Sequence, residues 1–121
     1  MQRDMDLIRK MVLAIEAHPS GWAPKVQLDG YDSGQVGYHA YLLVDSGLAV
    51  GSDMTTSGSS GPQYCIDHLT STGHDFAESA RSEFIWNEVR DEMKKKGVVS
   101  AALDVVKRLL DKQIRKQLDV E

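Results

Sequence analysis

Residues 38–50, Tyr-His-Ala-Tyr-Leu-Leu-Val-Asp-Ser-Gly-Leu-Ala-Val, decide the fold, because a helix pattern passes directly into a strand pattern within them. Apolar residues keep helical spacing as far as Val44, and Ser46-Gly47 ends the helix, since glycine adopts the left-handed turn that closes many helices. Leu48-Ala49-Val50 then predicts a short strand. A helix that runs straight into a strand in this way is typical of the core of a winged helix-turn-helix.

The residues after this stretch predict the rest of a β-hairpin, the wing of such a fold. Residues 51–62 are dominated by Gly, Ser and Thr and predict a flexible loop. Gln63 to Leu69 alternates through Tyr64 and Ile66 and predicts the return strand. The wing therefore spans residues 48–69 approximately.

Before the wing, the sequence predicts two amphipathic helices at residues 4–17 and 33–45. Trp22 to Asp29 alternates weakly and predicts a short strand, and the turn at residues 30–33 supplies an N-cap for the second helix. The residues expected to face inward are Met5, Ile8, Met11, Val12 and Ile15 in the first helix and Val36, Ala40, Leu43 and Val44 in the second.

After the wing, residues 72–95 predict a helix that starts after a Thr70 cap, breaks near residues 80–82 and closes at Gly97. A last helix at residues 101–118, capped by Ser100, carries an apolar stripe that packs back on helix 4–17 or forms a dimer seam. The residues expected to be buried are Phe76, Ala80, Phe84 and Val89, the two tryptophans Trp22 and Trp86, and the stripe Leu103, Val106, Leu110, Ile114 and Leu118.

These elements predict an α+β fold, a winged helix-turn-helix over residues 1–121 with a helical extension at about 81–119. A chain of 121 residues with 41% hydrophobic residues supports one folded domain. No apolar run approaches the roughly 18 residues of a membrane span. The first six residues contain no apolar signal region, so we expect a cytoplasmic protein that does not enter a membrane.

The charges divide the chain into three parts. The formal net charge is -4, and residues 26–80 contain no Lys or Arg but seven acidic residues. Both flanking parts mix acids and bases, with a small excess of bases. The centre of the chain is therefore an acidic block without bases.

Four separated segments resemble one known family. Residues 3–10 are similar to the opening of the phage and prophage proteins catalogued as domain of unknown function 2513, and Tyr38-His39-x-Tyr41-Leu42-Leu43 to Gly47-Leu48 is similar to their central helix. Leu69-Thr70-x-x-Gly73-His74-x-Phe76 and residues 85–87 are similar to the segment after their wing. The resemblance implies a winged-helix fold, in the company of the YjcQ-like winged helices, and a mobile-element setting. It implies no established activity and no catalytic residues.

Two functions are consistent with this sequence. A winged helix suggests a DNA-binding regulator, but phosphate contacts by Lys and Arg supply most DNA affinity, and the central helix and wing have none. We therefore favour a protein-binding module or inhibitor that binds a host or phage factor through its acidic centre. The residues expected to contact that protein partner are Gln35, Tyr38, His39, Tyr41, Asp45, Asp53 and Met54. The residues expected to contact DNA in the alternative function are Lys94, Lys95, Lys96, Arg115 and Lys116.

The sequence predicts no enzyme, metal site or cofactor. Cys65, His68 and His74 have a spacing that metal ligands could use, but a zinc ion needs about four ligands with suitable geometry. As the only cysteine, Cys65 excludes a disulfide framework, and nothing in the sequence places a base beside it. The sequence leaves open whether the protein is a monomer or a homodimer.

Overall fold

The first helix, α1 (Met5–Ala17), begins one residue after the predicted start, because Asp4 is its N-cap. The Asp4 carboxylate accepts hydrogen bonds from the backbone amides of Asp6 and Leu7 at 2.9 and 3.2 Å, which satisfies amides that a helix start leaves unpaired. The helix ends at His18, before Pro19. Its buried residues are Leu7, Ile8, Met11, Val12 and Ile15, whereas Met5 is half-buried.

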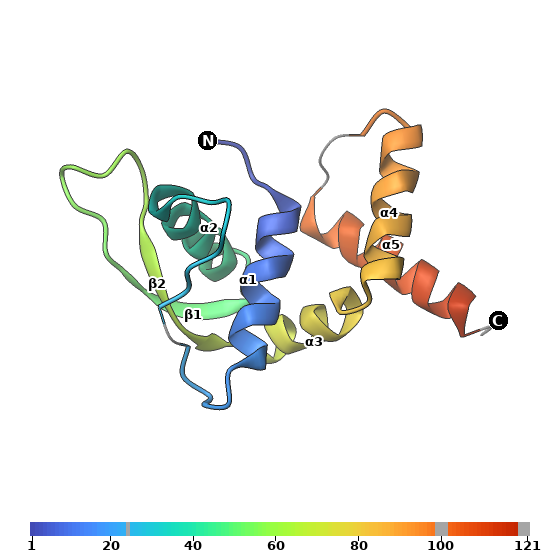
Figure 1. Ribbon diagram of the computed structural model, residues 1–121, viewed down its shortest axis with the longest axis horizontal. Helices are drawn as coiled ribbons and strands as arrows, with labels where there is room; N and C mark the ends of the chain where they lie inside the picture. The colour runs from blue at the N-terminus through green and yellow to red at the C-terminus, as the bar shows by residue number, and fades with distance from the viewer. Residues whose placement is uncertain (24, 99–101, 119–121) are drawn as a thin grey trace. The chain divides into compact units, whose positions relative to one another are not determined.

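The computed structural model describes residues 1–23, 25–98 and 102–118. Within them lie five helices and one two-stranded antiparallel sheet, which confirms the α+β class (Figure 1). The chain divides into two units, Met1–Ala77 and Glu78–Glu121. No helix in the described part is both long and apolar enough to cross a membrane.

In the first unit, α2 (Ser33–Asp45) packs on one face of the hairpin formed by β1 (Ala49–Asp53) and β2 (Tyr64–Leu69). Figure 1 shows α2 between the hairpin and α1. The core of this unit lies between these elements and includes Leu7, Met11, Ala40, Leu43, Leu48 and Ile66. Val36 and Val44, which we expected to be buried, are half-buried.

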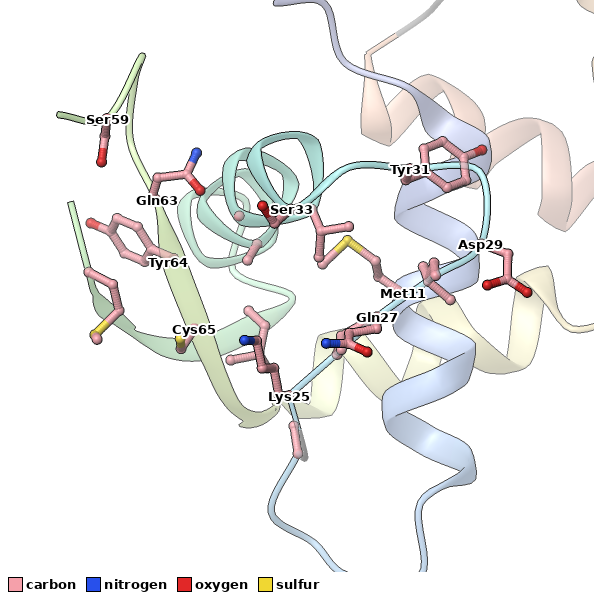
Figure 2. A pocket seen from close by; sticks show the side chains of 18 residues that line it. Met11, Lys25, Gln27, Asp29, Tyr31, Ser33, Ser59, Gln63, Tyr64 and Cys65 are labelled. Carbon is pink, nitrogen blue, oxygen red and sulfur yellow. The ribbon is translucent and has the colours of Figure 1, made fainter. Parts of the chain in front are cut away.

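The predicted strand at residues 22–29 is wrong. Among the described residues of this segment, only the Ala23 amide bonds to the sheet, donating to the Asp67 carbonyl of β2 at 2.7 Å. Val26 and Leu28 still face inward while Lys25 and Gln27 are exposed, so the alternation that suggested a strand is present. Figure 2 shows the stretch that carries Lys25, Gln27 and Asp29 running apart from β2, and these residues are not assigned to a strand.

Thr70 joins the hairpin to the next helix, α3 (Ser71–Ala80). Its backbone amide donates to Leu48 and its hydroxyl to the Gly47 carbonyl, at 3.0 and 2.6 Å, and that hydroxyl accepts the Gly73 amide at 3.0 Å. The predicted cap is therefore confirmed. Gly73 is buried, and a Cβ there would overlap the Leu48 carbonyl oxygen, so only glycine allows this close approach.

The long helix predicted at residues 72–95 is interrupted after Ala80, where we expected a break. Ser82 caps α4 (Glu83–Lys95) by accepting the Ile85 amide at 3.2 Å, and Gly97, with φ of 73°, closes it. Because this new helix buries Trp86 and Val89, Phe84 lies on the other side and is 58% exposed, contrary to expectation.

The last helix, α5 (Leu103–Gln117), packs with α4 in the second unit. It begins two residues later than predicted, after Ala102, and the proposed Ser100 cap lies outside the described residues. Val106 and Leu110 are buried as expected, but Leu118 is 68% exposed because it lies beyond the helix end.

Candidate functional site

His39 is a structural residue and not the surface residue that we expected. Only 1% of it is exposed, and both ring nitrogens are hydrogen-bonded. Nε2 accepts the backbone amide of Asp4, and Nδ1 donates to the Gln35 carbonyl, each at 2.8 Å. This pairing requires the neutral ring with its proton on Nδ1. His39 therefore connects the start of α1 to α2 and cannot contact a partner.

Gln35 and Asp32 cap α2 reciprocally. The Asp32 carboxylate accepts the Gln35 amide at 2.8 Å, and the Gln35 side-chain oxygen accepts the Asp32 amide at 3.0 Å. This capping box uses the oxygen with which Gln35 would contact a partner. Gln35 thus sets where α2 begins.

Tyr38 and Tyr41 lie on the same side of α2, as their spacing predicted. Their rings form a row that continues onto the hairpin through Tyr64. Their ring centroids are 5.8 Å apart, and Tyr41 lies 5.3 Å from Tyr64 of β2. All three rings are half-buried. Sequence reasoning missed Tyr64 as a site residue, although the alternation of β2 placed it on the same sheet face as Ile66.

Two acidic residues and one methionine extend this surface. Asp45 is exposed one turn after Tyr41, and Asp53 is paired with Tyr64 across the two strands. Hydrogen bonds from the Thr55 side chain and then from its backbone amide lower the pKa of Asp53. Met54 follows Asp53 and is 56% exposed. We call Tyr38, Tyr41, Asp45, Asp53, Met54 and Tyr64 the helix–hairpin face.

Gln63 fixes the hairpin against α2, a role that the sequence did not suggest. Its side-chain amide donates to the Gly34 carbonyl at 3.1 Å. A Cβ at Gly37 would overlap this amide group, which accounts for a glycine in the middle of a helix. The position of the hairpin relative to α2 is therefore set by a specific polar contact.

A groove of about 830 Å³ lies between β2, the first half of α2 and the chain at residue 23 and residues 25–31. In Figure 2, Tyr64 and Cys65 stand on the β2 side, whereas Lys25, Gln27 and Asp29 stand on the opposite segment. The apolar residues among those that line it are Met11, Ala23, Val26, Leu28, Val36, Ala40, Met54 and Ile66. The Ala23–Asp67 hydrogen bond closes one end of this groove.

The cysteine and histidines that could have held a metal are engaged separately. Cys65 is exposed on β2, His68 lies 5.6 Å from the Trp22 ring, and His74 lies 3.9 Å from the Glu16 carboxylate. In the described ranges, no three His, Cys, Asp or Glu residues gather as metal ligands. Trp22 itself is 68% exposed, contrary to the predicted core position, because it follows the exposed Gly21 in a surface loop.

The basic residues of the alternative function lie in the second unit. Lys94, Lys95 and Lys96 are exposed at the end of α4, and Arg115 and Lys116 are exposed in the last turn of α5. This unit also contains Glu92, whose carboxylate bonds to Lys112 at 3.2 Å and lies 3.8 Å from Lys96.

Glu92 is the acidic centre of a small polar cluster between α4 and α5. Besides the two lysines, its carboxylate accepts the Gln113 side-chain amide at 3.3 Å. The hydrogen bond from Lys112 holds the pKa of Glu92 below its usual range, although partial burial opposes this shift. The carboxylate therefore stays ionised and reduces the positive charge that this unit presents.

Comparison with known proteins identifies a family. Residues 2–99 match the family described as "Hypothetical protein (DUF2513)". The chain belongs to the DUF2513 family. An uncharacterized protein of Haemophilus influenzae is similar, with 28% identity over 120 residues that cover 98% of this chain and 99% of that protein. No solved structure matches the chain.

The segments that resemble the DUF2513 family include residues with clear structural roles. In the central helix, His39 bonds to Asp4. After the hairpin, Thr70 and Gly73 allow α3 to begin against Leu48. Residues in these segments therefore join α1 to α2 and allow α3 to lie close to the hairpin.

Proposed function

We propose that this protein is a non-catalytic binding module that docks on another protein through the helix–hairpin face, with α2 and the hairpin acting as a winged helix. The proposal rests on one observation: residues 26–80, which include all of α2 and both strands, contain no Lys or Arg. We place its action in the cytoplasm, where its single cysteine would remain reduced.

The missing bases argue against DNA as the ligand of this face. DNA affinity depends on Lys and Arg that neutralise phosphates and release counterions. The helix–hairpin face instead offers Asp45 and Asp53, which repel phosphates, beside the Tyr41–Tyr64 ring contact. Tyrosines are common anchors at protein interfaces.

The exposed bases Lys94, Lys95, Lys96, Arg115 and Lys116 favour the second candidate, DNA binding through α4 and α5. Fluorescence polarisation on random duplex DNA at about 50 mM salt tests it, because non-specific binding strengthens as salt falls. We expect no binding. Binding that disappears when Lys94, Lys95 and Lys96 become glutamine would establish the DNA-binding function instead.

A second experiment tests protein binding. Immobilised protein captures partners from the native cell, and the same capture is repeated with Asp45→Lys/Asp53→Lys. The matched control is the triple change of Lys94, Lys95 and Lys96 to glutamine. We expect one reproducible partner, lost with the aspartate variant and retained by the control. A partner that survives the aspartate variant would exclude the helix–hairpin face.

A further inference from the structure

The outer edge of β2 is the starting point, because the sheet has only two strands and β1 occupies the other edge of β2. The Met54 amide donates to the Gln63 carbonyl at 2.7 Å. In an antiparallel ladder bonded and non-bonded pairs alternate, so Ser52–Cys65 is the next bonded pair. The backbone amides and carbonyls of Tyr64 and Ile66 consequently point away from β1.

These groups face the groove, and no backbone group in the described part of the chain bonds to them. Across the described residues, the single backbone bond to the outer edge of β2 is the one from Ala23 to Asp67. A strand edge whose backbone groups lack backbone partners is a template on which another extended chain can pair. The groove gives that chain a place to lie, with Tyr64, Cys65 and Ile66 on one side and residues 25–29 on the other (Figure 2).

The lining of the groove determines which side chains fit. Val36, Ala40 and Ile66 provide an apolar floor for alternate side chains of an added strand. At the rim, Asp29 lines the groove, and Asp53 precedes the lining residue Met54. Lys25 is the only base among the lining residues. With Asp29 and the neighbouring Asp53 against the single base Lys25, the charge around the groove is net negative, which favours positively charged side chains that alternate with apolar ones.

We propose that an extended segment of the partner protein, alternating apolar and Lys or Arg residues, adds as a third strand to the outer edge of β2 and fills this groove. Main-chain hydrogen bonds to Tyr64 and Ile66 supply the pairing, as in other cases of strand addition. This inference rests on the proposed function, since it names the form of the protein partner.

Cys65 provides a native handle for the test. The peptide alternates lysine and valine over about seven residues, within the usual length of a strand. It carries a glycine linker and a cysteine activated as a mixed disulfide, which exchanges with the free Cys65 thiol and releases the activating thiol. Tethering raises the effective concentration to about the millimolar range, so a weak intrinsic affinity does not hide pairing. The readout is amide hydrogen exchange of Tyr64 and Ile66, with the amides of α4 as internal reference.

We expect the lysine–valine peptide to slow exchange at Tyr64 and Ile66 about tenfold or more. A peptide that is N-methylated on its pairing edge, or that has glutamate for lysine, is expected to protect them much less. Asp29→Lys should weaken the protection, whereas Asp111→Lys, an exposed aspartate in α5, should not.

Several results would overturn the inference. Equal protection by the N-methylated peptide would show contact without strand pairing, and no protection under tethering would show that the edge does not accept a strand. Slow exchange in the free protein would mean that residues 25–29 already occupy the edge. If the protection increased with protein concentration, a second copy of the chain would be the occupant. If strand pairing fails while Asp45→Lys/Asp53→Lys still abolishes partner capture, only this inference fails and the proposed function stands.

Discussion

The Nε2 atom of His39 accepts the backbone amide of Asp4 over 2.8 Å, although the two residues are 35 positions apart. Asp4 is also the N-cap of α1. Its carboxylate accepts amides of its own helix, while its backbone amide donates to a residue of α2. This relationship fixes the beginning of α1 on α2 and explains why a histidine is buried at this position.

Replacing His39 by alanine should therefore destabilise the protein by about 2–4 kcal/mol. The substitution leaves a cavity and removes the acceptor of a partly buried amide. Chemical denaturation followed by circular dichroism measures the loss. His18→Ala is the control, because His18 accepts only the exposed Ser20 amide, and its effect should stay within about 0.5 kcal/mol. Equal effects of the two changes would contradict the assigned role of His39.

Gly73→Ala should destabilise the protein, although alanine is the better helix former by about 1 kcal/mol. The added methyl group would overlap the Leu48 carbonyl, which is backbone and cannot move aside. We expect a loss of about 1–3 kcal/mol in denaturant unfolding. Thr72→Ala, an exposed position in the same helix, should be neutral or slightly stabilising. A stabilising Gly73→Ala would mean that α3 does not approach Leu48 so closely.

Gly37 and Gln63 should be coupled in a double-mutant cycle. Gly37→Ala displaces the Gln63 amide from Gly34, and Gln63→Ala alone loses that hydrogen bond, worth about 0.5–1.5 kcal/mol. Once Gln63 is alanine, Gly37→Ala should stabilise the protein by about 0.5–1 kcal/mol through helix propensity. Strictly additive unfolding free energies would exclude the contact.

The Glu92 cluster predicts a loss of stability in acid. Because Lys112 lowers the pKa of folded Glu92, its contribution is complete above the ordinary glutamate pKa of about 4.3 and disappears as the pH falls through the lowered value. Thermal unfolding between about pH 7 and 3 should show a drop in Tm that is smaller in Glu92→Gln. Glu88→Gln, an exposed position in the same helix, is the control and should leave the drop unchanged. An identical drop with Glu92→Gln would show that other carboxylates cause it.

The limits of most helices were predictable because local signals set them. Asp4 and Ser82 cap helices with their own side chains, and Gly47 and Gly97 have positive φ values of 80° and 73° where helices end. Each signal acts within about four residues, so the sequence alone contains it. The start of α5 was placed two residues early because Ala102 provides no side-chain cap.

The errors arose where distant residues decide the outcome. His39 is buried because the start of α1 needs an acceptor, which nothing near His39 in the sequence reveals. The strand predicted at residues 22–29 has the right alternation, but a strand requires a partner, and among the described residues of this segment only Ala23 bonds to β2. For the proposed helix–hairpin face, the sequence named Tyr38, Tyr41, Asp45, Asp53 and Met54, which stay a prediction, whereas the groove and the contacts of Tyr64 and Gln63 required the tertiary structure.

Thr70 binds the hairpin at its base through Gly47 and Leu48, and this has a consequence for protein engineering. Because both strand ends are fixed there, Gln63 holds the hairpin on α2 and Thr55 bonds to Gln63, the exposed tip at Ser57 and Gly58 can change in length with little effect on the fold. Doubling a flexible loop costs only about 0.6 kcal/mol of closure entropy. This loop is therefore a suitable place to insert an epitope tag or a fluorescent reporter, or for natural sequences to diversify.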